Sequence, residues 1–200
     1  TKDLVAQVLA EAGETVVPPG SFNNEIGVPL TATRVGAGTR YLVSELGARG
    51  RGHIRWLCGI VPPQVGLVIN VGHAHLGEFG SVAAIAEAKG ELVEVLPADG
   101  WAVLNADDEL VSGMAARTRA RLATFAVGAE PAFGELRLWA EDVSADALQR
   151  PEFVLHAAGT ASGAHPVHLQ VSGHHQVANA LAAAAVAITQ GMAAARVAAV

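Results

Sequence analysis

The sequence is poor in lysine, cysteine and long apolar runs. Of its 13 basic residues, eleven are arginine, and Lys2 and Lys89 are the two lysines. The single cysteine, Cys58, cannot form an internal disulfide and fits a reducing compartment. The longest apolar run, Val177 to Ile188, is shorter than the roughly 20 residues of a membrane-spanning helix and contains Asn179. We therefore expect a cytoplasmic globular protein that is not inserted into a membrane.

The charge balance argues against a nucleic-acid partner. The chain carries 19 acidic residues and a formal net charge of −6, and its arginines form no cluster. Proteins that bind nucleic acids need a basic surface to follow the phosphates. An anionic small molecule can still bind through a metal ion. With 200 residues and 51% hydrophobic content, the chain is long enough for one well-buried domain spanning residues 1–200.

The pattern of apolar residues predicts an α/β domain. Buried strands are expected at 41–46, 65–71, 101–104 and 122–127, and helices at 2–12, 25–33, 51–60, 81–96 and 109–117. This alternation is typical of a parallel sheet flanked by helices. After Pro131, short segments at 136–143, 153–156 and 167–171 alternate better and predict a small attached antiparallel sheet. An alanine-rich helix at 175–190 follows, and another helix begins at Ala193.

Polar residues follow three of the predicted strands. Glu45 closes the first, His73 and His75 follow the second, and Asn105, Asp107 and Asp108 follow the third. Ligands of open parallel sheets bind beyond the carboxyl ends of the strands, so these groups predict a site there. Each also has a structural interpretation: Glu45 can be paired, His75 can cap a helix, and the Asn105 to Asp108 turn can cap the next helix.

Lys89 lies on the apolar face of the predicted helix 81–96, opposite Glu87, Glu91 and Glu94. A lysine in such a place commonly extends its ammonium to solvent. If the side chain is buried instead, desolvation lowers its pKa and favours the reactive neutral amine. The sequence leaves both interpretations open.

Two histidine-containing segments are candidate ligand-binding sites. The spacing of His73 and His75 is a weak metal signal, because magnesium prefers oxygen ligands and zinc usually needs three or four. His175 and Asn179 share one face near the start of the alanine-rich helix. That pair can contact a base or ribose, or can simply cap the helix.

An ordered series of short motifs closely resembles the central ATP-binding domain of the Mur ligases. The resemblance covers essentially the whole chain and rests on Thr1 to Leu4, Pro19 to Thr31, Ser44 to Ala48, Asn70 to Leu76, Glu87 to Glu91 and Leu104 to Asp108. The block Phe22-Asn23-Asn24-Glu25 is similar to the branch of the family that adds D-Ala-D-Ala to a UDP-MurNAc-tripeptide.

The resemblance implies a P-loop NTPase-like fold and an ATP-dependent amide ligase of peptidoglycan synthesis. ATP and Mg²⁺ are the implied cofactors, and a monomer acting on UDP-MurNAc-tripeptide and D-Ala-D-Ala is expected. The resemblance implies magnesium ligands at Glu45, at His75 and, if it is carbamylated, at Lys89. It implies that Asn23 and Asn24 lie near the phosphates and the nucleotide-sugar. The residues implied around the adenosine are Asn105, Asp107, His175 and Asn179.

The chain also departs from the family pattern. The Gly-rich phosphate loop, expected immediately before Thr1, is absent, as are the flanking domains, so the chain alone is expected to bind ATP poorly. Gln176 replaces a common asparagine, and His73 has no assigned role. Two alternatives remain at this point: a ligase similar to folylpolyglutamate synthase, against which the Phe22 to Glu25 block argues, and a non-catalytic scaffold or nucleotide-binding module.

Overall fold

A computed structural model describes residues 1–72 and 81–200. Its main feature is a six-stranded sheet with the strand order β3-β4-β5-β6-β7-β8. The strands are β3 (Val65–Val68), β4 (Trp101–Asn105), β5 (Arg121–Val127), β6 (Leu136–Ala145), β7 (Pro151–Gly159) and β8 (Gly163–His168). The fold is the predicted α/β class, with mixed strand directions in one sheet.

The sheet changes direction at β6. Strands β3, β4, β5 and β6 pair in parallel, whereas β7 and β8 pair antiparallel. The expected antiparallel segment is therefore present, but it continues the parallel sheet through β6. The prediction of a strand over 167–171 was wrong, because β8 lies earlier in the chain and its residues 163–168 pair with β7.

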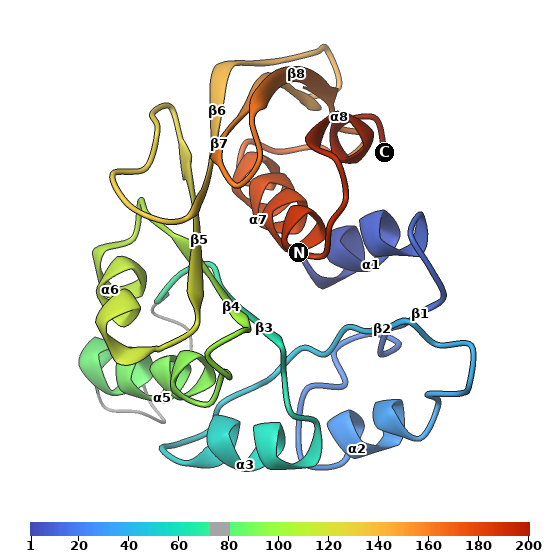
Figure 1. Ribbon diagram of the computed structural model, residues 1–200, viewed down its shortest axis with the longest axis vertical. Helices are drawn as coiled ribbons and strands as arrows, with labels where there is room; N and C mark the ends of the chain where they lie inside the picture. The colour runs from blue at the N-terminus through green and yellow to red at the C-terminus, as the bar shows by residue number, and fades with distance from the viewer. Residues whose placement is uncertain (73–80) are drawn as a thin grey trace.

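Helices cover both faces of this sheet (Figure 1). Helix α7 (Gln176–Thr189) packs across the strands on one face, and α1 (Lys2–Ala10) lies beside α7. Helix α5 (Val82–Glu94), α6 (Glu109–Ser112) and the 3₁₀ helix η1 (Gly113–Arg117) cover the other face. Helix α8 (Ala194–Ala198) packs against β8 and α7.

The alternation of side chains along β4 explains why both faces are covered. Val103 belongs to the apolar cluster under α7, whereas its neighbours Ala102 and Leu104 belong to the cluster under α5. Successive residues of a strand point to opposite faces, so a strand that is apolar at every position must be buried on both. Five of the seven alanines of α7 are buried, and their small side chains let the helix lie close to the sheet.

A second, two-stranded parallel sheet joins β1 (Thr15–Val16) to β2 (Tyr41–Leu42). Helices α2 (Gly27–Ala32) and α3 (His53–Ile60) lie near it in Figure 1. The predicted strand over 41–46 was therefore too long, and it belongs to this small sheet instead of the main one. In the part of the chain that the structure describes, no helix has the length and apolar character needed to cross a membrane.

Candidate active site

An open pocket of about 680 Å³ lies between the two sheets. Its walls come from α1, from the segment that begins with β2, from β3 and the residues after it, and from α5. The polar side chains that line it include Thr1, Lys2, Arg40, Ser44, Glu45, Asn70 and Lys89. The pocket thus brings Glu45 and Lys89, predicted as site residues from distant parts of the sequence, to one cavity. Both lysines of the chain also line it.

Three side chains hold the segment that follows β3. Asn105 Nδ2 donates to the carbonyl oxygen of Ile69 at 2.9 Å, and Lys89 Nζ donates to that of Asn70 at 2.6 Å. The backbone N–H of Val71 donates to Asp108 Oδ2 at 2.8 Å. These groups come from the end of β4, from α5 and from the N-terminus of α6, so three elements fix the backbone at one wall of the pocket.

The Lys89 side chain is half-buried between α5 and this wall. Burial lowers the pKa of the Lys89 ammonium, and the smaller effect of the nearby Asp108 carboxylate opposes that shift. A lowered pKa raises the fraction of neutral amine at a given pH. Lys2 is held differently: its ammonium donates to Asp3 Oδ1 at 2.7 Å and to the carbonyl oxygen of Pro18 at 3.2 Å.

Glu45 is held in place from the loop before α2. Asn23 Nδ2 donates to Glu45 Oε1 at 2.7 Å, and the backbone N–H of Gly47 donates to the carbonyl oxygen of Asn23 at 2.7 Å. A Cβ on Gly47 would press on the Asn23 side chain, so the absence of a side chain there permits the close approach. Asn23 therefore orients Glu45. Because β2 ends at Leu42, the prediction that Glu45 closes a strand of the main sheet was wrong.

Two predicted binding residues have their polar atoms engaged within the fold. Asn24 Oδ1 accepts from the backbone N–H groups of Ile26 and Gly27 at 3.2 and 2.9 Å, which places it at the start of α2. Asn105 is 8% exposed, and its Oδ1 accepts from the N–H of Asp107 at 3.0 Å while its Nδ2 bonds Ile69. Both side chains shape local backbone in this structure.

The residues expected around adenosine lie on two elements. Asp107 follows β4, and its Oδ2 accepts from the backbone N–H of Val127 at 2.8 Å. His175 is exposed immediately before α7 and makes no side-chain cap. Asn179, in the first turn of α7, accepts from Thr1 Oγ1 at 2.5 Å and donates to Gln176 at 2.9 Å. Asn179 thus joins the beginning of α7 to the residue that precedes α1.

A magnesium site is compatible with the donors that the structure describes. His73 and His75 lie outside the described residues, and among residues 1–72 and 81–200 no three His, Cys, Asp or Glu side chains gather to hold a metal. Magnesium usually takes one or two protein carboxylates and completes its shell with phosphates and water. The Glu45 carboxylate is such a donor, and the neighbouring Ser44 Oγ is buried without a hydrogen-bond partner in the described part of the chain.

Two residues make structural contacts that the sequence pattern did not predict in full. Asp108 caps α6 through Oδ1, which accepts from Leu110 and Val111 at 3.0 and 3.1 Å, and ties Val71 through Oδ2. Its position in an Asn-Ala-Asp-Asp turn indicated the cap but not the tie to Val71. Glu91 was expected on the polar face of its helix, but the structure buries it.

A family model described as the Mur ligase middle domain matches residues 1–187. The chain belongs to this family. The UDP-N-acetylmuramoyl-tripeptide–D-alanyl-D-alanine ligase of Mycobacterium tuberculosis is 50% identical over 199 residues, which cover 100% of this chain and 38% of that protein. The Escherichia coli K12 ligase of the same name is 35% identical, over 95% of this chain and 40% of its own length.

Solved Mur ligase structures have the same fold. MurF from Acinetobacter baumannii superposes with a TM-score of 0.86 at 29% identity, over 98% of this chain and 41% of that one. MurF from Thermotoga maritima, solved in complex with ADP, gives a TM-score of 0.80 at 27% identity, over 100% of this chain and 45% of that one. The Mur ligase domain described here therefore spans about two fifths of the length of these relatives.

Proposed function

We propose that this chain is the ATP-binding domain of a ligase that adds D-Ala-D-Ala to a UDP-MurNAc-tripeptide. The observation that carries the proposal is the 50% identity to the mycobacterial D-Ala-D-Ala ligase over the entire chain. The ADP complex of the Thermotoga maritima relative supports ATP as the nucleotide. In this reaction ATP phosphorylates the tripeptide carboxylate, and the amine of D-Ala-D-Ala displaces phosphate to form the amide.

The pocket between the two sheets is the proposed catalytic centre. Magnesium would supply charge neutralisation at the phosphates, and Glu45 would hold it through carboxylate oxygens. Asn23 keeps that carboxylate oriented into the pocket by donating to Oε1. Such fixed charges accelerate phosphoryl transfer because little reorganisation is needed in the transition state.

Lys89 is the proposed site of carbamylation. Its half-buried amine has a lowered pKa, and a neutral amine adds CO₂ to give an N-carboxylate with loss of one proton. The product retains one N–H, which can keep the hydrogen bond to the Asn70 carbonyl oxygen. The new carboxylate would be a second anionic ligand for magnesium in the same pocket as Glu45. His75 is proposed to act with it.

We also propose that the pocket receives the phosphate loop of a longer protein. In the described part of the chain β2 pairs with β1 alone and β3 with β4 alone, and residues of both β2 and β3 line the pocket. Backbone N–H groups of a Gly-rich loop would cradle the phosphates there. Asp107, His175 and Asn179 are proposed to lie around the adenosine. Asn24 is proposed to contribute through the start of α2, which it caps. A cytoplasmic monomer is proposed.

The proposed function is tested with the full-length protein, ATP, Mg²⁺, UDP-MurNAc-tripeptide and D-Ala-D-Ala. We expect one phosphate released for each tripeptide-dipeptide conjugate detected by mass spectrometry. Reactions with single D-alanine, and with a folate and L-glutamate, serve as controls. Ligation of glutamate to the folate would favour the folylpolyglutamate synthase alternative. ATP binding without turnover of either substrate set would favour a non-catalytic module.

A further inference from the structure

Glu91 is a buried carboxylate where the helical pattern predicted an exposed one. Its residue is 7% exposed, and it is the single charged residue among the buried polar residues of the described chain. The other acidic residues of α5, Glu87 and Glu94, are exposed. A buried charge is costly unless hydrogen bonds compensate it, so the partners of Glu91 are informative.

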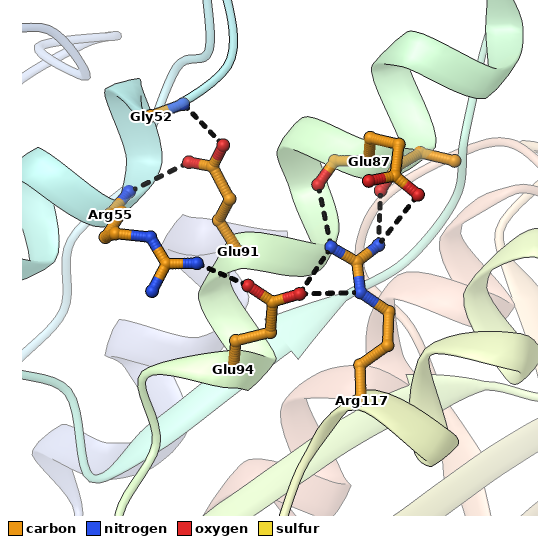
Figure 2. A network of polar contacts seen from close by, with 7 residues as sticks. Gly52, Arg55, Glu87, Glu91, Glu94 and Arg117 are labelled. Carbon is orange, nitrogen blue, oxygen red and sulfur yellow. Dashed lines mark hydrogen bonds and ion pairs between the residues drawn. The ribbon is translucent and has the colours of Figure 1, made fainter.

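The partners of Glu91 are backbone N–H groups at the start of α3. Gly52 donates to Oε1 at 2.5 Å and Arg55 donates to Oε2 at 3.1 Å, as Figure 2 shows. The first N–H groups of a helix have no partners within the helix, and a carboxylate also interacts favourably with the helix dipole there. Glu91 therefore caps α3 from a different helix.

The opposite side of the same helical turn is held by Arg117. Its guanidinium donates to the carbonyl oxygen of Glu87 at 3.1 Å and to Glu94 Oε1 at 2.7 Å (Figure 2). Gly90 provides the room, because a Cβ at that position would overlap the guanidinium. Contacts on two sides thus fix the turn of α5 that carries Lys89.

These contacts connect the two residues proposed to hold magnesium. Lys89 lies two residues before Glu91 on α5, and Glu45 lies in the segment that leads to Gly52. That segment is fixed at one end by the bonds of Asn23 to Glu45 and Gly47. Its other end is fixed by Glu91.

We propose that Glu91 is a positioning residue that sets the spacing between Glu45 and Lys89. It does so by joining the backbone at the end of the Glu45 segment to the helix of Lys89. The inference rests on the proposed function, because it assigns a purpose to that spacing. A shift of about 1 Å in such a site is enough to reduce turnover by roughly 100-fold.

The test compares Glu91→Gln and Glu91→Ala with Glu130→Gln in the full-length protein. Glutamine has the same length and one acceptor oxygen, so Glu91→Gln keeps part of the cap, whereas alanine keeps none. Glu130→Gln removes a charge from an exposed carboxylate that pairs with the Arg137 side chain, away from α3 and α5. It is the matched control.

The first measurement is hydrogen exchange of peptides that cover residues 44–52. We expect exchange about threefold faster in Glu91→Gln, faster still in Glu91→Ala, and unchanged in Glu130→Gln. This readout needs no activity. If exchange stays at the wild-type rate in both Glu91 variants, the contact does not hold the segment and the inference is overturned.

The second measurement is turnover as a function of Mg²⁺ concentration, at a temperature where thermal melts show every variant folded. We expect kcat to fall about 10- to 100-fold in Glu91→Ala and less in Glu91→Gln. The Mg²⁺ concentration for half-maximal rate should rise about threefold or more. Faster exchange with unchanged kcat and Mg²⁺ dependence would make Glu91 merely structural and overturn the inference.

The two measurements separate this inference from the proposed function. If the wild-type protein ligates D-Ala-D-Ala and the Glu91 variants match it, the positioning role is wrong and the function stands. If the wild-type protein has no ligase activity, the function is wrong, and the positioning role falls with it whatever the exchange shows. If Glu91→Ala does not fold, Glu91→Gln decides the outcome.

Discussion

The amine of Lys89 donates a hydrogen bond to the backbone carbonyl oxygen of Asn70 over 2.6 Å, which joins α5 to the segment that follows β3. A compact ammonium group on a flexible side chain suits this contact. An arginine at the same position would present a broader, permanently charged guanidinium. In a chain with eleven arginines, this contact gives a physical reason for one of its two lysines.

Replacement of Lys89 tests carbamylation in the full-length protein. We expect Lys89→Ala to lose ligase activity and a small added carboxylic acid to restore part of it, because the acid fills the vacated anionic position. Lys89→Arg should stay inactive, since a guanidinium is not neutralised to take up CO₂. Phosphate release with both substrates is the measurement. Retention of most activity by Lys89→Arg would instead make Lys89 a simple positive charge.

Removal of the Glu45 carboxylate should reduce turnover without unfolding the protein. We expect Glu45→Ala to lower kcat about 100-fold or more, because it removes a fixed charge that stabilises the transition state. His75→Ala is expected to have an effect of similar size. Glu152→Ala, at a half-exposed position on β7, is the control. Steady-state kinetics measure the loss of turnover, and thermal melts show whether each variant is folded. A near wild-type kcat in both Glu45→Ala and His75→Ala would contradict the proposed roles.

Asp108 should matter for stability through its three backbone hydrogen bonds. We expect Asp108→Ala to lower the free energy of unfolding by about 1–3 kcal/mol, because it exposes the first N–H groups of α6 and leaves that of Val71 unpaired. Asp99→Ala, in an exposed turn, should change it by less than about 0.5 kcal/mol. Urea unfolding of the two variants gives the comparison, and equal midpoints would show that the Asp108 bonds contribute little.

Cys58 should make the fold less stable at alkaline pH. Burial, assisted by the nearby Glu91 carboxylate, raises the pKa of the thiol to about 11. In the unfolded chain a thiol ionises near pH 8.5, so the folded state binds more protons above that pH. The resulting stabilisation is complete below about pH 8.5 and is lost as the pH rises toward 11. Urea unfolding at several pH values gives the free energy of unfolding as a function of pH. Between pH 8.5 and 11 this free energy should fall less steeply in Cys58→Ala than in the wild type. The same slope in both proteins would contradict the raised pKa.

The 200-residue chain alone should have negligible ATPase and ligase activity. The reason is that it spans about two fifths of the length of its relatives. We propose that a phosphate loop and flanking domains of the longer protein complete the site. The same phosphate-release assay, run beside the full-length protein, is the measurement. Comparable turnover by the two would show that the chain carries a complete site.

The sequence predicted the elements whose patterns are local. The apolar run of β4, the Ser81 cap of α5 and the alanine-rich α7 all lie where periodicity placed them. The pattern failed where a strand depends on a pairing partner elsewhere in the chain. Tyr41 to Leu46 reads as one buried strand, but only Tyr41 and Leu42 find a pairing partner in the described chain.

The candidate site was predicted only in part, because local motifs identify residues but not their distant neighbours. The motifs gave Glu45 and Lys89, and the structure adds that both line one pocket. Helical periodicity assigned Glu91 to the polar face because the pattern uses only the polarity of each residue. It does not show which other element a side chain contacts. That neighbour is the start of α3, more than thirty residues earlier in the chain, and no local pattern encodes it.

The two outer strands of the main sheet differ in how well they resist aggregation. Strand β8 contains Pro166, which has no N–H to offer an incoming strand, and α8 packs against it. Strand β3, with the sequence Val-Gly-Leu-Val, has neither protection on the side away from β4 in the described part of the chain. Self-association of the isolated domain should therefore begin at β3.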